Sequence, residues 1–296
     1  MIGVFGMAEP LPDAKRHPTM RDRRGQARGV RDGMPVVQRA GCTLHYWIEG
    51  SGPPLVLASG LGGTAEWWAP QAEAYARRFT LLRFDQRGTG ASSRVPVASV
   101  EEMAADLVAI LDHAGIGRAR MLGHSTGGAI GIAMALDHPQ RLSSLVVYAS
   151  TTHGDAYRRR VFALRKLLHA QGGVAAYAQY TSLLLYPPYW INAHDGRLAA
   201  MEAAAGAGLG SAEVQGSRLD AILRFDRRAE FGRIGIPVRV VCADDDILTP
   251  RYFSEEFARL IPGAEAVFVP RGGHALSRTE PALFDDAVLP FLEADA

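Results

Sequence analysis

Residues 120–136 read RMLGHSTGGAIGIAMAL, and this stretch decides the fold. We interpret residues 120–123 as a strand and residues 129–136, which are apolar on every side, as a deeply packed helix. Between them stands Gly123-His124-Ser125-Thr126-Gly127, a G-x-S-x-G motif. A serine in this context projects its hydroxyl from a sharp strand-to-helix turn, where flanking glycines avoid clashes with the neighbouring backbone. We therefore predict that Ser125 is a nucleophile at the end of a sheet strand.

The sequence on both sides of this motif alternates short apolar strands with amphipathic helices. This pattern predicts an α/β fold with a mostly parallel, doubly wound sheet. The predicted strands cover residues 35–39, 43–49, 54–58, 80–84, 120–123, 142–148, 238–243 and 264–269. The predicted helices cover residues 67–78, 100–111 and 129–136, a segment that starts at 249–250, and a closing segment that includes 283–291.

Two helix starts carry local signals. Ser99 and Glu102 form a capping box, in which each side chain is expected to accept the free backbone amide of the other residue. Thr249-Pro250 is a favourable N-cap and first-turn pair. We predict that both serve as helix N-termini.

The alternation stops between residues 150 and 231, where the sequence becomes helical and is broken by glycine and proline pairs. We predict an α/β core from residues 35–149 and 232–296, with residues 150–231 as a helical insertion. Residues 1–34 are rich in arginine and lack a periodic apolar pattern, so we predict a disordered arm. Acidic residues interspersed in this arm argue against a tail that binds nucleic acid.

Composition narrows the class of protein. The 296 residues are 48% apolar and 21% charged, with a net charge of +1, as is typical of a soluble globular protein. No apolar run approaches the roughly 20 residues needed to span a bilayer, and no secretory signal pattern is present. We expect a cytoplasmic protein with no nucleic-acid or membrane partner. Cys42 and Cys242 are too far apart in sequence to indicate a disulfide framework or a zinc site.

A serine nucleophile needs a base, and His274 is the best candidate among the nine histidines. It stands in the loop Arg271-Gly272-Gly273-His274, directly after the last predicted strand and at the carboxyl end of the sheet. The other eight histidines lack that context. His124 adjoins the serine, but we expect the turn to point its ring elsewhere.

The acid that orients the base should follow the strand at residues 238–243, where Asp244-Asp245-Asp246 offers three carboxylates. We predict Asp246, which stands four residues before Pro250, and take Asp245 as the next choice. A metal site built on this cluster is a weaker hypothesis, because one run of sequence supplies few convergent ligands.

The transition state of acyl transfer needs amide donors for its oxyanion. The residue after the nucleophile supplies one, here Thr126, at the N-terminus of a helix whose dipole favours negative charge. The loop Ser59-Gly60-Leu61-Gly62-Gly63 follows the strand at residues 54–58, and we predict the Leu61 amide as the second donor.

The ordered set of loop, serine turn, aspartate and histidine resembles the α/β-hydrolase superfamily from Pro35 to the C-terminus. Asp85-Gln86-Arg87-Gly88 matches its D-x-R-G turn. Among its groups, the chain looks most like the RutD hydrolases of pyrimidine utilisation, which cleave aminoacrylate or carbamate, and next like 3-oxoadipate enol-lactonases. Strings shared with these groups are SGLGG at 59–63, DQRGTG at 85–90, LYPPYW at 185–190 and GGHA at 272–275. Ser59 stands where most of the superfamily has histidine.

The resemblance implies that the insertion is a cap that roofs the site and limits substrate size. Trp67, His153, Tyr186 and Trp190 are candidates to line it, although packing is the commoner role of such residues. We expect a serine hydrolase of a small ester, lactone, amide or carbamate, with no cofactor or metal and with a homodimer as one possible assembly. The alternatives are a carbon–carbon bond hydrolase or perhydrolase with the same triad, and a ligand receptor with slow turnover.

Overall fold

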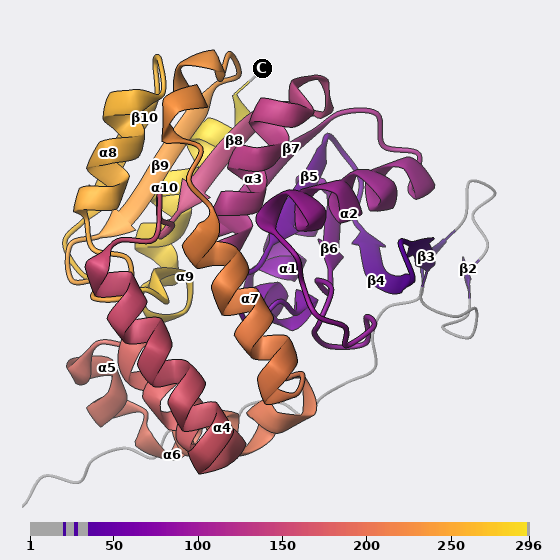
Figure 1. The fold of residues 1–296 in the computed structure, drawn as a ribbon. Helices are drawn as coiled ribbons and strands as arrows, with labels where there is room; N and C mark the ends of the chain where they lie inside the picture. Colours follow the sequence, from indigo (N-terminus) through magenta and orange to yellow (C-terminus); the bar gives the residue numbers. More distant parts are fainter. Residues whose placement is uncertain (1–19, 22–26, 29–34, 295–296) are drawn as a thin grey trace, which may run out of the picture. The chain divides into compact units, whose positions relative to one another are not determined.

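The computed structural model describes residues 20–21, 27–28 and 35–294. Its centre is an eight-stranded sheet with the order β10-β9-β8-β7-β5-β6-β4-β3 (Figure 1). The strands are β3 (Val36–Arg39), β4 (Cys42–Glu49), β5 (Pro54–Ala58), β6 (Thr80–Phe84), β7 (Ala119–His124), β8 (Leu142–Tyr148), β9 (Val238–Ala243) and β10 (Glu265–Val269). The strands from β10 to β6 pair in parallel, whereas β4 pairs antiparallel with β6 and with β3. The predicted α/β class and mostly parallel sheet are confirmed.

Helices cover both faces of this sheet. They are η1 (Ala65–Trp68), α1 (Ala69–Ala76), α2 (Val100–His113), α3 (Thr126–Asp137), η2 (Pro139–Arg141), α8 (Tyr252–Leu260), α9 (Leu276–Thr279) and α10 (Pro281–Glu293). Successive side chains of a strand point to opposite faces. Val56 accordingly belongs to the cluster that contains α2, α3 and α8 residues, whereas Leu55 and Leu57 belong to the cluster that contains α1 and α10 residues. A strand buried on both faces reads as a continuous apolar run, which explains PLVLA at 54–58.

The chain between β8 and β9 is helical. It contains α4 (Ala156–Leu185), α5 (Pro188–Ala193), α6 (Asp195–Ala204), η3 (Ala205–Ala207), α7 (Ala212–Arg224) and η4 (Arg228–Arg233). Figure 1 shows α4, α5, α6 and α7 gathered in one group beside the sheet. The breaks fall at the predicted places, since α4 has non-helical backbone angles at Gly173 and ends before Pro187-Pro188. None of the described helices is both long and apolar enough to cross a membrane.

Residues Met1–Met34 form a unit separate from Pro35–Ala296. In it, β1 (Met20–Arg21) pairs antiparallel with β2 (Ala27–Arg28). The remainder of the predicted arm lies outside the described residues, so its disorder stays a prediction.

Of the two predicted helix starts, the one at Ser99 is confirmed and the one at Thr249 is wrong. Ser99 caps α2 by accepting the amide of Glu102, but the Glu102 carboxylate accepts the amide of Ala98, one residue before the expected partner. Thr249 is not an N-cap, because α8 starts at Tyr252 and the Thr249 hydroxyl donates instead to a carboxylate. The carboxylate belongs to Asp246, three residues earlier in the same loop, and this bond takes the place of the expected helix cap.

A buried ion pair ties the turn after β6 to α2. The guanidinium of Arg87 donates two hydrogen bonds of 2.8 Å to the two carboxylate oxygens of Asp106, and a third nitrogen lies 2.8 Å from Glu102. Hydrogen bonding to Asp106 raises the pKa of Arg87. Planar two-point pairing of this kind fixes both position and orientation.

We expect Asp106→Ala to lower the free energy of unfolding by about 3–5 kcal/mol, because it leaves Arg87 buried without its main counter-charge. Urea unfolding measures the change. Glu73→Ala is the control, since Glu73 pairs with Arg77 on an exposed helix surface and its loss should matter little. Equal effects of the two substitutions would contradict the role of the buried pair.

Candidate active site

The predicted site residues all follow parallel strands and therefore meet at one edge of the sheet. The loop at 59–63 follows β5, Ser125 follows β7, Asp246 lies three residues beyond β9, and His274 lies in the loop after β10. Residues far apart in the sequence are thus brought together by strand direction alone.

Ser125 occupies the tight turn between β7 and α3. Its backbone has φ 53° and ψ −113°, a conformation that residues other than glycine rarely adopt. The turn is held by two hydrogen bonds: the Ser125 amide donates to the Tyr148 carbonyl at 2.8 Å, and the Ser150 hydroxyl donates to the Ser125 carbonyl at 2.7 Å. Strain that is held in place in this way is common at functional sites.

The glycines of the motif are required by close backbone contacts. A Cβ atom at Gly127 would lie 2.3 Å from the carbonyl oxygen of Ala58, and one at Gly123 would lie 2.3 Å from the carbonyl oxygen of Gly127. A Cβ atom at Gly60 would lie 3.1 Å from the Cβ of Ser125. The loop after β5 is therefore pressed directly against the serine turn.

His274 and Asp246 form a buried hydrogen-bonded pair. Nδ1 of His274 lies 2.9 Å from Oδ2 of Asp246, and both side chains are almost fully buried. A carboxylate only accepts, so Nδ1 of His274 is the donor of this hydrogen bond. Asp246 is itself held, because Oδ1 accepts the amides of Leu248 and Thr249 and Oδ2 accepts the Thr249 hydroxyl at 2.6 Å. Within the described residues, neither Nε2 of His274 nor Oγ of Ser125 has a hydrogen-bond partner.

The backbone of His274 is fixed from behind by two side chains. The Tyr148 hydroxyl donates to the His274 carbonyl at 2.9 Å and accepts the Ser277 amide at 3.0 Å. Nε2 of His124 lies 3.1 Å from the same carbonyl, and its ring stacks on Trp67 with centroids 4.6 Å apart. The ring of His124 thus supports the loop that carries His274.

His124 is held in its neutral form. Burial, and secondarily the neighbouring His274, lower its pKa well below the usual value. Because the carbonyl of His274 only accepts, Nε2 of His124 carries the proton and Nδ1 is a buried lone pair without a partner. The neighbour of His274 therefore carries no competing positive charge.

The two predicted oxyanion donors lie on the two segments that touch. Leu61 belongs to the loop after β5, and Thr126 is the first residue of α3. Neither amide donates to an acceptor within the described part of the chain. Both are thus available to a ligand at the helix N-terminus.

The other candidates have structural partners. Asp245 accepts the Gly273 amide at 2.7 Å, so it supports the His274 loop but not the imidazole. Tyr186 and Trp190 stack on each other and are buried, and His153 lies 3.4 Å from Glu256. Sequence reasoning did not identify Thr249 and Tyr148 as supports of the pair, because neither has a local signature of that role.

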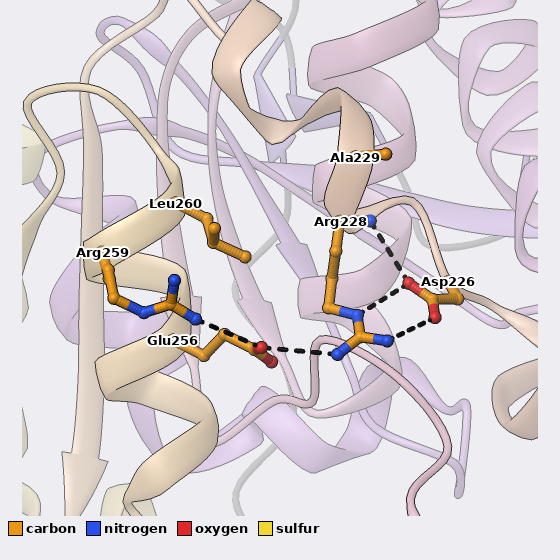
Figure 2. A pocket seen from close by; sticks show the side chains of 6 residues that line it. All are labelled: Asp226, Arg228, Ala229, Glu256, Arg259 and Leu260. Carbon is orange, nitrogen blue, oxygen red and sulfur yellow. Dashed lines mark hydrogen bonds and ion pairs between the residues drawn. The ribbon is translucent and has the colours of Figure 1, made fainter.

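The surface also has a pocket of about 550 Å³ whose lining includes none of Ser125, Asp246 and His274. Figure 2 shows its lining from η4 and α8, with Arg228 between Asp226 and Glu256, and Arg259 on the other side of Glu256. Its charged groups pair with one another. In the residues that the structure describes, no group of three histidine, cysteine or acidic side chains gathers as metal ligands.

Comparison with known proteins agrees with this architecture. The family model of the α/β hydrolase fold matches residues 53–178. The chain is 37% identical over 259 residues to a protein named RutD carbamate hydrolase from Azorhizobium caulinodans, which covers 87% of this chain and 98% of the relative. The chain belongs to the α/β-hydrolase family. It is also 40% identical to the RutD carbamate hydrolase of Stutzerimonas stutzeri, over 84% of this chain and 95% of that one.

Solved structures place this hydrolase among enzymes of the same fold. The enol-lactonase from Burkholderia xenovorans superposes with a TM-score of 0.81 at 26% identity, covering 88% of this chain and all of the other. A hydrolase from Pseudomonas aeruginosa gives a TM-score of 0.82 at 28% identity, covering 89% of this chain and all of the other. The protein is therefore an enzyme of the α/β-hydrolase class.

We expect Gly127→Ala to destabilise the hydrolase by about 3 kcal/mol or more, at or above the upper end for overpacking, because the added methyl group meets backbone that cannot move aside. Gly216→Ala is the matched control: it lies inside α7 with open space around its Cβ position and should stabilise by about 0.5–1 kcal/mol. Thermal and urea unfolding of both variants measure the difference. Similar values for the two would contradict the close contact at Gly127.

Acidification should weaken the hydrolase partly through His124. The unfolded chain takes up a proton on this ring below about pH 6.5, whereas the folded chain does not, so the stability present above that pH is lost as pH falls. We expect His124→Leu to reduce the slope of unfolding free energy against pH between 7 and 5, by at most about 1.4 kcal/mol per pH unit. His169→Leu isolates the second histidine whose pKa burial lowers. An unchanged slope in His124→Leu would refute this account.

Proposed function

We propose that the enzyme is a serine hydrolase that cleaves a small ester, lactone, amide or carbamate through an acyl-enzyme. The observation that carries this proposal is the 2.9 Å hydrogen bond between His274 and Asp246, at the same sheet edge as the strained turn of Ser125. The names of the RutD relatives support a carbamate as the first substrate class to test.

In this mechanism Nε2 of His274 takes the proton of Ser125 as Oγ attacks the substrate carbonyl. Asp246 keeps Nδ1 protonated and stabilises the imidazolium that forms. The amides of Leu61 and Thr126 bind the oxyanion. His274 then returns its proton to the leaving group. In the second half-reaction His274 takes a proton from the water that attacks the acyl-enzyme, and it returns this proton to Oγ of Ser125 as the acyl product leaves.

The closest alternative uses the same triad for carbon–carbon bond hydrolysis or perhydrolysis, and identification of the products separates these reactions. A slow-turnover receptor would bind ligand, seen as a thermal shift, without releasing product.

We expect Ser125→Ala to abolish both turnover of short-chain p-nitrophenyl esters and labelling by a fluorophosphonate probe, with a loss in kcat of up to about 10⁶-fold. His274→Ala should lose a comparable amount, because the hydroxyl then lacks its base. Steady-state kinetics and mass spectrometry of the labelled peptide measure both effects. A folded protein that is not labelled at Ser125 would refute the proposal.

Asp246→Asn should lower kcat by about 10⁴-fold, because an amide stabilises the wrong imidazole tautomer. Asp245→Asn is the matched control, since its neighbouring carboxylate contacts the Gly273 amide and not the ring. A larger loss in Asp245→Asn than in Asp246→Asn would reassign the acid.

A further inference from the structure

The loop that carries the Leu61 amide is anchored in an unexpected way. The hydroxyl of Ser59 is buried and has no hydrogen-bond partner among the described residues, so no such bond from this side chain holds the loop. Gln86, two residues beyond β6, does so: its Nε2 donates to the Ser59 carbonyl at 2.7 Å, and its amide donates to the Gly63 carbonyl at 2.7 Å. Gln86 therefore holds both ends of the 59–63 loop by hydrogen bonds.

Arg218 of α7 reaches the same loop from the helical insertion. Its guanidinium donates to the Leu61 carbonyl at 3.1 Å, to Oε1 of Gln86 at 2.7 Å and to the Arg87 carbonyl. A Cβ atom at Gly63 would lie 2.8 Å from its Nη2, so the loop and the guanidinium fit closely.

These bonds enclose the peptide that carries the predicted donor. The Leu61 amide belongs to the peptide between residues 60 and 61, whose carbonyl accepts the Gly63 amide at 3.0 Å. Gln86 holds the peptide before it, and Arg218 holds the peptide after it. The direction of the Leu61 amide is therefore set from both sides.

Arg218 also brings an unneutralised charge. Its side chain is fully buried, and among residues 35–294 no carboxylate forms an ion pair with it. Burial lowers its pKa to about 10, which still leaves it protonated at neutral pH. An isolated buried cation is costly, and its field favours negative charge that develops nearby.

We propose that Arg218, acting with Gln86, is a positioning residue that aims the Leu61 amide at the oxyanion and so makes the helical insertion part of the catalytic machinery. This inference rests on the proposed serine-hydrolase function. Arg218 touches the loop and not the reacting atoms.

The test compares an oxygen ester with its thionoester analogue in the full-length enzyme. Sulfur is larger than oxygen and a weaker hydrogen-bond acceptor, so an oxyanion site shaped for oxygen prefers the ester. The ratio of kcat/KM values for the two substrates does not depend on the fraction of active protein, and fluorophosphonate titration supplies that fraction separately.

We expect Arg218→Met to lower kcat for the ester by about tenfold to a hundredfold with a smaller change in KM, as a displaced donor would. The ester-to-thionoester ratio should fall as well. Arg218→Lys should recover part of the kcat and part of the ratio relative to Arg218→Met. Gln86→Met should lower both quantities in the same way, which keeps the test decisive if Arg218→Met does not fold. Arg224→Met is the control, because Arg224 lies on the same helix but donates to the Ala98 carbonyl.

Folded variants at Arg218 and Gln86 with an unchanged ester-to-thionoester ratio would overturn the positioning role, even if kcat fell. Absence of Ser125-dependent turnover in the wild type would instead refute the proposed function, and this inference with it.

Discussion

The contact between the turn at Ser125 and the end of β5 is the constraint on which the site depends. Gly127 sits against the Ala58 carbonyl with no space for a side chain, and Ser125, two residues earlier, has a positive φ. This contact packs the start of α3 directly against the carboxyl end of β5. It also brings the 59–63 loop against the serine, so one packing requirement positions both the hydroxyl and the amides around it.

The remaining parts of the site converge because parallel strands end at one edge. The loop after β9 turns back so that Asp246 accepts two amides and a hydroxyl while it faces His274. The loop after β10 is held through the carbonyl of His274 by Tyr148 and His124. His274 is thus fixed through its backbone as well as its side chain, which limits the reorganisation needed during a reaction.

The sequence predicted those features that local pattern determines. Continuous apolar runs predicted the buried strands. The G-x-S-x-G motif predicted the turn at Ser125, because only glycine fits where two backbone segments are in contact. The order of strands in the sequence predicted that Asp246 and His274 follow consecutive strands, and these strands, β9 and β10, are neighbours in the sheet. The prediction that Thr249 caps a helix was wrong, because its hydroxyl donates to the Asp246 carboxylate instead. The contacts of Arg218 could not be predicted, since an arginine on a polar helix normally faces water and only tertiary packing shows that this one does not.

Arg87 and Arg218 are neighbouring buried arginines whose charges are handled in different ways: the first is paired with carboxylates and the second is bonded to neutral groups. Arg87 is paired with Asp106 and Glu102, and its pKa is raised, as in a group whose charge the fold stabilises. Arg218 donates to the carbonyl of this same Arg87, yet all of its acceptors within residues 35–294 are neutral, and burial lowers its pKa. A carboxylate beside Arg218 would cancel its field next to the Leu61 loop. Neutral carbonyl and amide acceptors instead keep its geometry fixed while the positive charge stays available, which suits the proposed role of the Leu61 amide as an oxyanion donor.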